Sequence, residues 1–293
     1  MLVVFEFSYN EAVVLSQCTV LGNYIIQSVI NFRKRHPNDS SRPLVYWDVV
    51  LILLPAQIGG STIGVIVEKV LPVTLLLAVA IVVVIYAGGM STKKGLITWK
   101  KETDAIAESL LHNVATNKLP SQDLLKGEPP EFRIPYFTLK VLISSWCVYA
   151  ALLVTTQVAV TTCSVGYILT LLSIYPLIVG LIAWGVSFAS QRQRDDPASI
   201  LPGDINFKDI TFVPPVMAFL IGIMCSLLGI GGGELMGPLL LSYQVIPPVS
   251  TATTSMMSLA TASSNILHYA ILNDIDYSWA AGMFVTGLCG GGW

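Results

Sequence analysis

The sequence predicts an all-α, polytopic transmembrane helical bundle in which one helix is broken by glycines. Hydrophobic residues make up 54% of the 293 residues and charged residues only 12%, whereas soluble domains carry about 25% charged residues. Apolar stretches of roughly 20 residues, long enough to cross a ~30 Å hydrocarbon core, alternate with polar segments. A glycine cluster at residues 229–233 separates two of the apolar stretches.

The first predicted span covers residues 11–32 and carries regularly spaced polar side chains. These are Ser16, Thr19, Asn23 and Gln27. Residues three or four positions apart share one helix face, and polar residues at membrane depth face protein or water rather than lipid. We therefore expect this face to point into the bundle. A basic cluster at 33–36 ends the span, and residues 37–43 are expected to form a polar loop.

The second and third spans differ in character. The second, residues 47–67, contains Gln57 and glycines that permit close helix packing. These glycines are Gly59, Gly60 and Gly64. A tight turn is expected at residues 68–69. The third span, residues 72–89, is almost purely aliphatic and is therefore expected to face lipid.

The remaining segments divide the chain into five parts. We expect a first membrane repeat (1–90), a polar loop (91–136), two transmembrane helices (137–189), a second polar loop (190–209) and a second membrane repeat (210–293). In the first loop, residues 93–111 favour a helix outside the membrane, and the proline-rich remainder favours irregular structure. The further predicted spans cover residues 137–158, 165–189, 210–228, 250–272 and 279 onward.

The basic residues predict the orientation of the chain. Of the 16 Lys and Arg residues, 15 lie within residues 33–42, 93–140 and 192–208. Alternating spans place these three regions on one side, which the positive-inside rule assigns to the cytosol. Loops 33–46, 91–136 and 190–209 are therefore expected to be cytosolic. Neither the membrane concerned nor the oligomeric state follows from the sequence.

The glycine cluster predicts a break within the membrane. Four of its five positions are glycine, namely Gly229, Gly231, Gly232 and Gly233, and each glycine costs a helix roughly 1 kcal/mol relative to alanine. Lipid cannot satisfy the freed backbone groups, so the break must be enclosed by protein or line a wet cavity. The apolar run after it, residues 235–245, reaches only about half-way across the membrane before Pro247 and Pro248.

A break followed by a half-length helix is typical of a midplane binding site in a secondary transporter. The positive end of that helix favours a small anion, with backbone N–H groups of the glycines as donors. The candidate substrate-binding residues are Gly231, Gly232, Gly233, Thr254, Ser255, Ser258, Asn265, Ser16, Thr19 and Asn23. For the hydroxyl residues, hydrogen bonding to a carbonyl of their own helix is the alternative. Gln57, in the second span, is a weaker candidate. His268 is weaker too, since a histidine near a span end is commonly interfacial.

Glu234 is an ionisable residue at predicted membrane depth, where such residues are costly and usually functional. It could carry a coupling proton or interact favourably with the N-terminus of the half-helix. A carboxylate beside an anion site would repel the substrate unless it is protonated.

The two polar-faced spans resemble each other at a constant offset of 239 residues. Residues 12–19 (AVVLSQCT) match residues 251–258 (TATTSMMS), each leading to a serine with a hydroxyl residue three positions later. The first copy ends in a basic cluster and the second at residues 273–276 without a basic residue. This pattern predicts two inverted repeats with the site at their interface.

Several motifs together resemble the TauE/SafE sulfite-exporter-like family, also called the toluene-sulfonate uptake permease family. The glycine break 229–233, the run 238–241, Pro248 and residues 253–269 resemble its signature, and residues 15–23, 33–37 and 99–102 resemble its plant-type branch. The resemblance implies secondary transport of a sulfur oxyanion or sulfonate. Family members carry an earlier glycine-rich break and further spans after the position of Trp293, so the chain is expected to be truncated at both ends.

Other functional classes find little support in the sequence. It contains no GxSG or HExxH motif, so an enzyme is not expected. The five scattered cysteines have no metal-ligand spacing, and neither metal nor cofactor is expected. No nucleic-acid recognition module is present, and the glycines do not complete a GxGxxG dinucleotide motif. The expected function is transport of a small anion by alternating access, with an anion channel or a non-transporting membrane subunit as alternatives.

Overall fold

The computed structural model describes residues 7–116, 136–159, 165–195, 204–205, 213–272 and 275–291. Within them the helices are α1 (Tyr9–Phe32), α2 (Trp47–Val70), α3 (Val73–Thr116), α4 (Tyr136–Ala159), α5 (Val165–Asp195), α6 (Val213–Leu228), α7 (Gly232–Ser242), α8 (Pro247–Ile271) and α9 (Tyr277–Gly290). One small hairpin, β1 (Arg35–His36) and β2 (Asp39–Pro43), is added. The prediction of an all-α bundle is confirmed. The expected irregular part of loop 91–136 and most of loop 190–209 lie outside the described residues.

Within the described part of the chain, five helices are long and apolar enough to cross a membrane. They are α1, α2, the first part of α3 (Val73–Ile97), most of α4 (Tyr136–Thr156) and most of α5 (Leu172–Asp195). The sixth predicted span is a shorter apolar helix, α6, of 16 residues. The region expected to extend beyond the membrane, residues 93–111, is helical and continues α3 without interruption.

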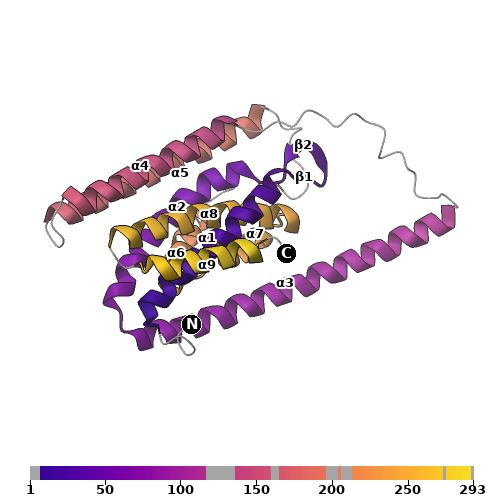
Figure 1. Cartoon of the computed structure of the whole chain (residues 1–293). Helices are drawn as coiled ribbons and strands as arrows, with labels where there is room; N and C mark the ends of the chain where they lie inside the picture. Colours follow the sequence, from indigo (N-terminus) through magenta and orange to yellow (C-terminus); the bar gives the residue numbers. More distant parts are fainter. Residues whose placement is uncertain are drawn as a thin grey trace.

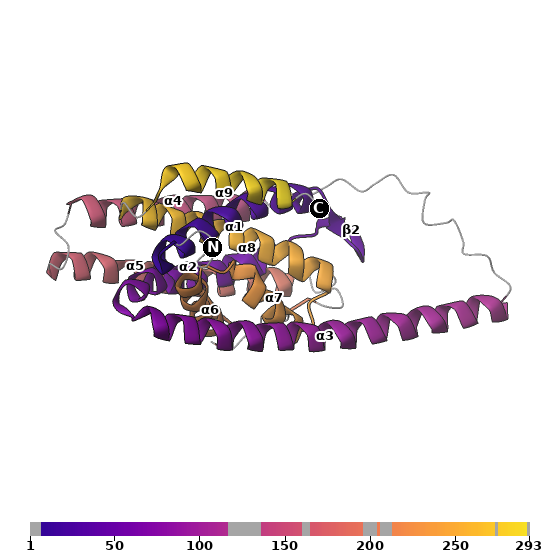
Figure 2. The same ribbon diagram turned by 60° about the horizontal axis from the view of Figure 1, so that its bottom comes forward.

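The core of the bundle consists of α1, α2, α6, α7, α8 and α9 (Figure 1). Helices α4 and α5 lie side by side along one flank, and α3 runs along another, with its second half projecting beyond the bundle (Figures 1 and 2). Most described aliphatic side chains of α3 are exposed, whereas α2 is almost completely enclosed. The lipid-facing character predicted for the third span fits this exposure.

Glycines allow two helix pairs to approach backbone to backbone. A β-carbon on Gly60 of α2 would overlap the Phe219 carbonyl of α6, and one on Gly222 of α6 would overlap the Gln57 carbonyl of α2. Gly22 of α1 and Gly287 of α9 make the same reciprocal contact. Such close approach increases the van der Waals packing that helps helices to associate in lipid, and it confirms the packing role predicted for the glycines of α2.

Hydrogen bonds define the relative directions of the central helices. The Tyr46 N–H donates to Thr253 Oγ1 at one end of α2 and α8, and the Tyr269 hydroxyl donates to Glu68 at the other, so these helices run parallel. Helix α1 runs the other way. Gln27, late in α1, bonds Ser255, early in α8, whereas Leu15, early in α1, packs in a cluster with Ile266, late in α8. Thus α1 and α8, which carry the two similar segments, are antiparallel.

The basic ends of several helices meet at one end of the bundle. Arg42 of the hairpin pairs with Asp204 at 2.8 Å, and Arg192 at the end of α5 lies 3.4 Å from Asp48 at the start of α2. The hairpin and the projecting end of α3 lie at this same end (Figures 1 and 2). We call it the basic end of the bundle.

The structure differs from three local predictions. Residues 35–43 form a hairpin rather than a loop, with Ser41 N–H and hydroxyl bonded to Asp39. Glu68 lies inside α2 rather than in a turn, and α2 ends only before Pro72. Pro247 begins α8, since proline lacks only an N–H group that a first helical turn leaves unpaired.

We expect Gly222→Ala to lower the stability of the bundle by about 1–3 kcal/mol, because the added methyl group overlaps a backbone carbonyl that cannot move freely. The control is Gly180→Ala in α5, where a β-carbon meets nothing within 4 Å. Thermal unfolding in detergent measures both variants. Equal melting temperatures would contradict the close α2–α6 packing.

Candidate functional site

The helix break spans three residues. Helix α6 ends at Leu228, and Gly229 takes a positive φ of 66°. The Ile230 N–H then donates to the Cys225 carbonyl at 3.1 Å, which is the hydrogen bond of a Schellman C-cap. Gly231 is the N-cap of α7. The predicted break is confirmed, but Gly232 and Gly233 are helical, since tertiary packing overrides their weak propensity.

The first turn of α7 is enclosed by three helices near their midpoints. A β-carbon on Gly231 would lie 2.8 Å from the Tyr24 ring of α1, and one on Gly233 would lie 2.7 Å from Ser258 Oγ of α8. A β-carbon on Gly232 would overlap the side-chain amide of Gln57 in α2. Glycine is required here because any side chain would displace these polar groups from the N-terminus of α7.

Two of these polar side chains are buried without a hydrogen bond of ordinary geometry. Gln57 and Ser258 each have 0% of their surface exposed. Among the described residues, neither amide atom of Gln57 has a hydrogen bond, and the Ser258 hydroxyl has none of ordinary geometry, its one polar neighbour being the Tyr24 hydroxyl. A buried polar group left unsatisfied costs about 1–3 kcal/mol, and a native protein that retains two of them at one point calls for an explanation.

The N-terminus of α7 supplies further donors, although the Glu234 N–H already donates to the Gly231 carbonyl at 3.1 Å. No side chain of the described residues caps it, and its first N–H groups carry the positive end of the helix dipole. The Tyr24 hydroxyl lies 3.1 Å from the β-carbon positions of both Gly231 and Gly233. Backbone amides, one side-chain amide and two hydroxyls therefore converge where a small anion could accept hydrogen bonds.

The sequence analysis missed Tyr24 and Thr261 and gave Gln57 little weight. Thr261 Oγ1 lies 3.6 Å from the β-carbon position of Gly232 and donates to the Met257 carbonyl at 2.6 Å. A lone glutamine inside an otherwise apolar span was a usable signal for Gln57. Tyr24 stands beside Asn23 and gave no periodic signal of its own.

The predicted residues of α8 are all buried but have different partners. Ser258 faces the break, whereas the Thr254 hydroxyl donates to the Thr251 carbonyl at 3.1 Å. Ser255 Oγ lies 3.1 Å from Gln27 Oε1 and 2.8 Å from the Thr251 carbonyl. Asn265 lies two turns beyond Ser258 and is 2% exposed.

The predicted residues of α1 divide between the break and α9. Ser16 reaches the break, where its hydroxyl donates to the Gly229 carbonyl at 2.6 Å. The Thr19 hydroxyl donates to the Leu15 carbonyl within its own helix. Asn23 accepts from Gln27 and lies against Gly291 after α9. Thr19 and Asn23 are thus not brought to the first turn of α7.

Glu234 lies in the first turn of α7 with an exposed side chain. It lines a cavity of about 320 Å³ whose opposite wall comes from α3, including Val84, Gly88 and Ser91. Gln57 and Ser258 do not line this cavity. The carboxyl group therefore lies in the same helical turn as the candidate site but borders a different space from Gln57 and Ser258.

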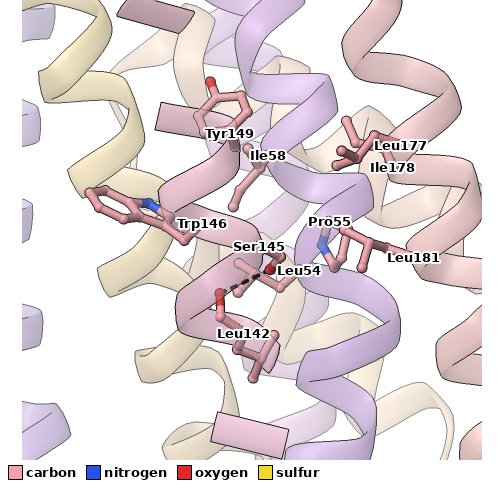
Figure 3. A pocket seen from close by; sticks show the side chains of 10 residues that line it. All are labelled: Leu54, Pro55, Ile58, Leu142, Ser145, Trp146, Tyr149, Leu177, Ile178 and Leu181. Carbon is pink, nitrogen blue, oxygen red and sulfur yellow. Dashed lines mark hydrogen bonds between the residues drawn. The ribbon is translucent and has the colours of Figure 1, made fainter. Parts of the chain in front are cut away.

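A second pocket, between α2, α4 and α5, has the wrong chemistry for an anion (Figure 3). Its volume is about 30 Å³, and most of its lining is aliphatic or aromatic. Its one serine, Ser145, donates to the Leu142 carbonyl at 2.9 Å. The Trp146 ring nitrogen donates to Ser264 of α8, which joins α4 to the core.

We expect Ser258→Ala to leave the melting temperature of the ligand-free protein unchanged or higher, because it removes a buried hydroxyl that makes no hydrogen bond of ordinary geometry. The matched variant is Ser226→Ala, since the Ser226 hydroxyl is equally buried but donates to the Gly222 carbonyl at 2.8 Å. That variant should lose about 1 kcal/mol. If thermal unfolding showed that Ser258→Ala loses more stability than Ser226→Ala, the Ser258 hydroxyl would have to be satisfied by a hydrogen bond.

Comparison with known proteins gives consistent matches along the chain. The family model described as "Sulfite exporter TauE/SafE" matches residues 1–293. Sulfite exporter TauE/SafE family protein 3 of Arabidopsis thaliana is 30% identical over 94% of this chain and 60% of its own length. Family proteins 2 and 5 of the same plant are each 26% identical, over 98% and 85% of this chain and 67% and 61% of their own lengths.

The chain thus spans about 60% of the length of several of these relatives. No solved structure matches it significantly.

Proposed function

The chain belongs to the sulfite exporter TauE/SafE family, and from this premise we propose that it is a secondary transporter of a small sulfur oxyanion or sulfonate. Plant relatives agree with the plant-type features of its sequence. With five helices long and apolar enough to span a bilayer, it is a multi-pass integral membrane protein. Transport, its substrate and its mechanism are our proposal.

One observation carries the proposal: unpartnered Gln57 and Ser258 meet the uncapped N-terminus of α7 inside the bundle. An anion placed there would accept hydrogen bonds from polar groups that are poorly satisfied in the described structure, and it would lie at the positive end of the helix dipole. The site is near the midpoints of α1, α2 and α8, as expected for a substrate that crosses between two sides.

The donors at this site are uncharged. No Lys or Arg occurs in α1, the break, α7 or α8, and the only one in α2 is Lys69 near its far end. Amide and hydroxyl donors suit the several oxygens of a sulfite or sulfonate group. Binding without a fixed cation is weaker than a charge-assisted contact, which allows the substrate to leave on the opposite side.

The position of the site between antiparallel α1 and α8 suggests how the transporter changes conformation. Both helices contact the break, α1 through Ser16 and Tyr24 and α8 through Ser258. We infer that rocking of one against the other exposes the site to each side in turn. The basic end, with loops 33–46, 91–136 and 190–209, faces the cytosol under the positive-inside rule.

We expect Gly232→Leu to abolish anion binding, because its side chain must displace the Gln57 amide from the N-terminus of α7. The control is Gly237→Leu in the same helix, where a β-carbon meets nothing within 4 Å. Binding of sulfite and methanesulfonate to the purified proteins is measured by calorimetry, and membrane insertion by fractionation. Unchanged binding in a correctly inserted Gly232→Leu protein would remove the break from the site.

Transport assays in liposomes distinguish a carrier from an anion channel of the same architecture. A carrier saturates with substrate and shows countertransport, whereas a channel shows neither. Binding without any flux would favour a non-transporting membrane subunit.

A further inference from the structure

A second buried polar cluster lies between α2 and α8, three helical turns from the candidate anion site. The side chain of Glu68 in α2 is 2% exposed and accepts a hydrogen bond from the Tyr269 hydroxyl of α8. Glu68 follows Gln57 by 11 residues, and Tyr269 follows Ser258 by 11 residues. Because α2 and α8 are parallel, the Glu68 carboxyl group lies about 16 Å from Gln57 along the interface between these two helices, which we call the α2–α8 seam.

Glu68 lies beside a buried hydrophobic cluster, whose Tyr9 interacts with it electrostatically. Tyr9 of α1 and Tyr269 belong to one buried cluster with Val65 of α2, and α3 and α6 contribute uncharged Leu76 and Leu227. The other described titratable groups nearby are His268, which precedes Tyr269 and is also buried, and Lys69, which is next on α2 and exposed.

This cluster also contacts the start of the break. The Tyr9 hydroxyl donates to the Leu227 carbonyl at 2.8 Å, in the last turn of α6 and two residues before Gly229. The elements around Glu68 therefore hold the end of the helix from which the break begins. A change of charge on the carboxyl group would act on the contacts that fix the break.

Glu68 lies nearer to one end of the bundle than the anion site does. The residue lies in the last turn of α2, beside exposed Lys69 and Val70, at the end of the bundle opposite the basic end. Removing an ionised carboxylate from water costs free energy, and ionisable residues at such depth commonly take part in proton relays. Glu234, by contrast, is exposed and borders the cavity beside α3.

We propose that Glu68, held between Tyr9 and Tyr269, is a proton-binding site that couples proton uptake from the end opposite the basic loops to anion binding at α7. The inference rests on the proposed transport function. One proton joins the carboxylate and no other bond forms or breaks. The neutral carboxyl group repels the anion less, so protonation tightens anion binding, and by linkage the anion favours protonation.

The test measures binding of methanesulfonate, which remains an anion across the pH range used, to the full chain from mildly acidic to mildly alkaline pH. Wild-type affinity should fall as pH rises. Glu68→Gln mimics the protonated state, so its affinity should be independent of pH and about fivefold higher than wild type at the alkaline end. Glu11→Gln, at the exposed start of α1, is the matched control and should keep the wild-type profile, because glutamine can replace glutamate in the capping box with Ser8.

A readout without anion separates this inference from the proposed function. Infrared difference spectra between acidic and alkaline pH should show a protonated carboxyl band in wild type that is absent in Glu68→Gln. If that band titrates but no anion binds, the transport proposal fails and the proton site stands. If Glu68→Gln keeps both the band and the wild-type pH profile, the proton site is overturned and anion binding stands.

A second variant guards against misfolding of Glu68→Gln. Tyr269→Phe keeps the carboxyl group but removes its hydroxyl donor, so it should move the midpoint of the pH profile without abolishing pH dependence. An unmoved midpoint in a folded Tyr269→Phe protein would contradict the role of the cluster.

Discussion

The backbone of a broken helix must find hydrogen bonds inside the protein, because lipid offers none. This requirement organises the core. The Schellman bond from Ile230 to the Cys225 carbonyl closes the end of α6, and Ser16 of α1 satisfies the Gly229 carbonyl. What remains open is the N-terminal turn of α7, and α1, α2 and α8 surround it with polar side chains.

Enclosing the break demands that helices approach more closely than ordinary side chains allow. Apolar packing has little driving force in lipid, so contact depends on small residues. The reciprocal contacts of Gly60 with α6 and Gly222 with α2 bring Gln57 beside α7. Gly22 and Gly287 likewise allow close contact between α1 and α9. The glycines that break one helix and those that join others thus belong to a single arrangement.

In our interpretation, the α2–α8 seam links anion binding at α7 to protonation of Glu68. Its middle holds unpartnered Gln57 and Ser258, and its far end holds Glu68 with Tyr269. Neutral donors at the first point and a carboxyl group at the second provide a site for an anion and a site for a proton on the same pair of helices. Their separation of about three turns allows electrostatic coupling while keeping the two ligands apart.

The sequence by itself determined the helical membrane architecture, because hydrophobicity and span length depend only on local composition. It also located the break and the half-length helix, since clustered glycines weaken any helix. Only the tertiary structure decided that Gly232 and Gly233 are helical, that Thr19 and Asn23 face α9, and that Glu68 lies buried beside Tyr269. Burial and partnership depend on residues distant in the chain, such as the 201 positions between Glu68 and Tyr269, and no local pattern encodes which of them meet.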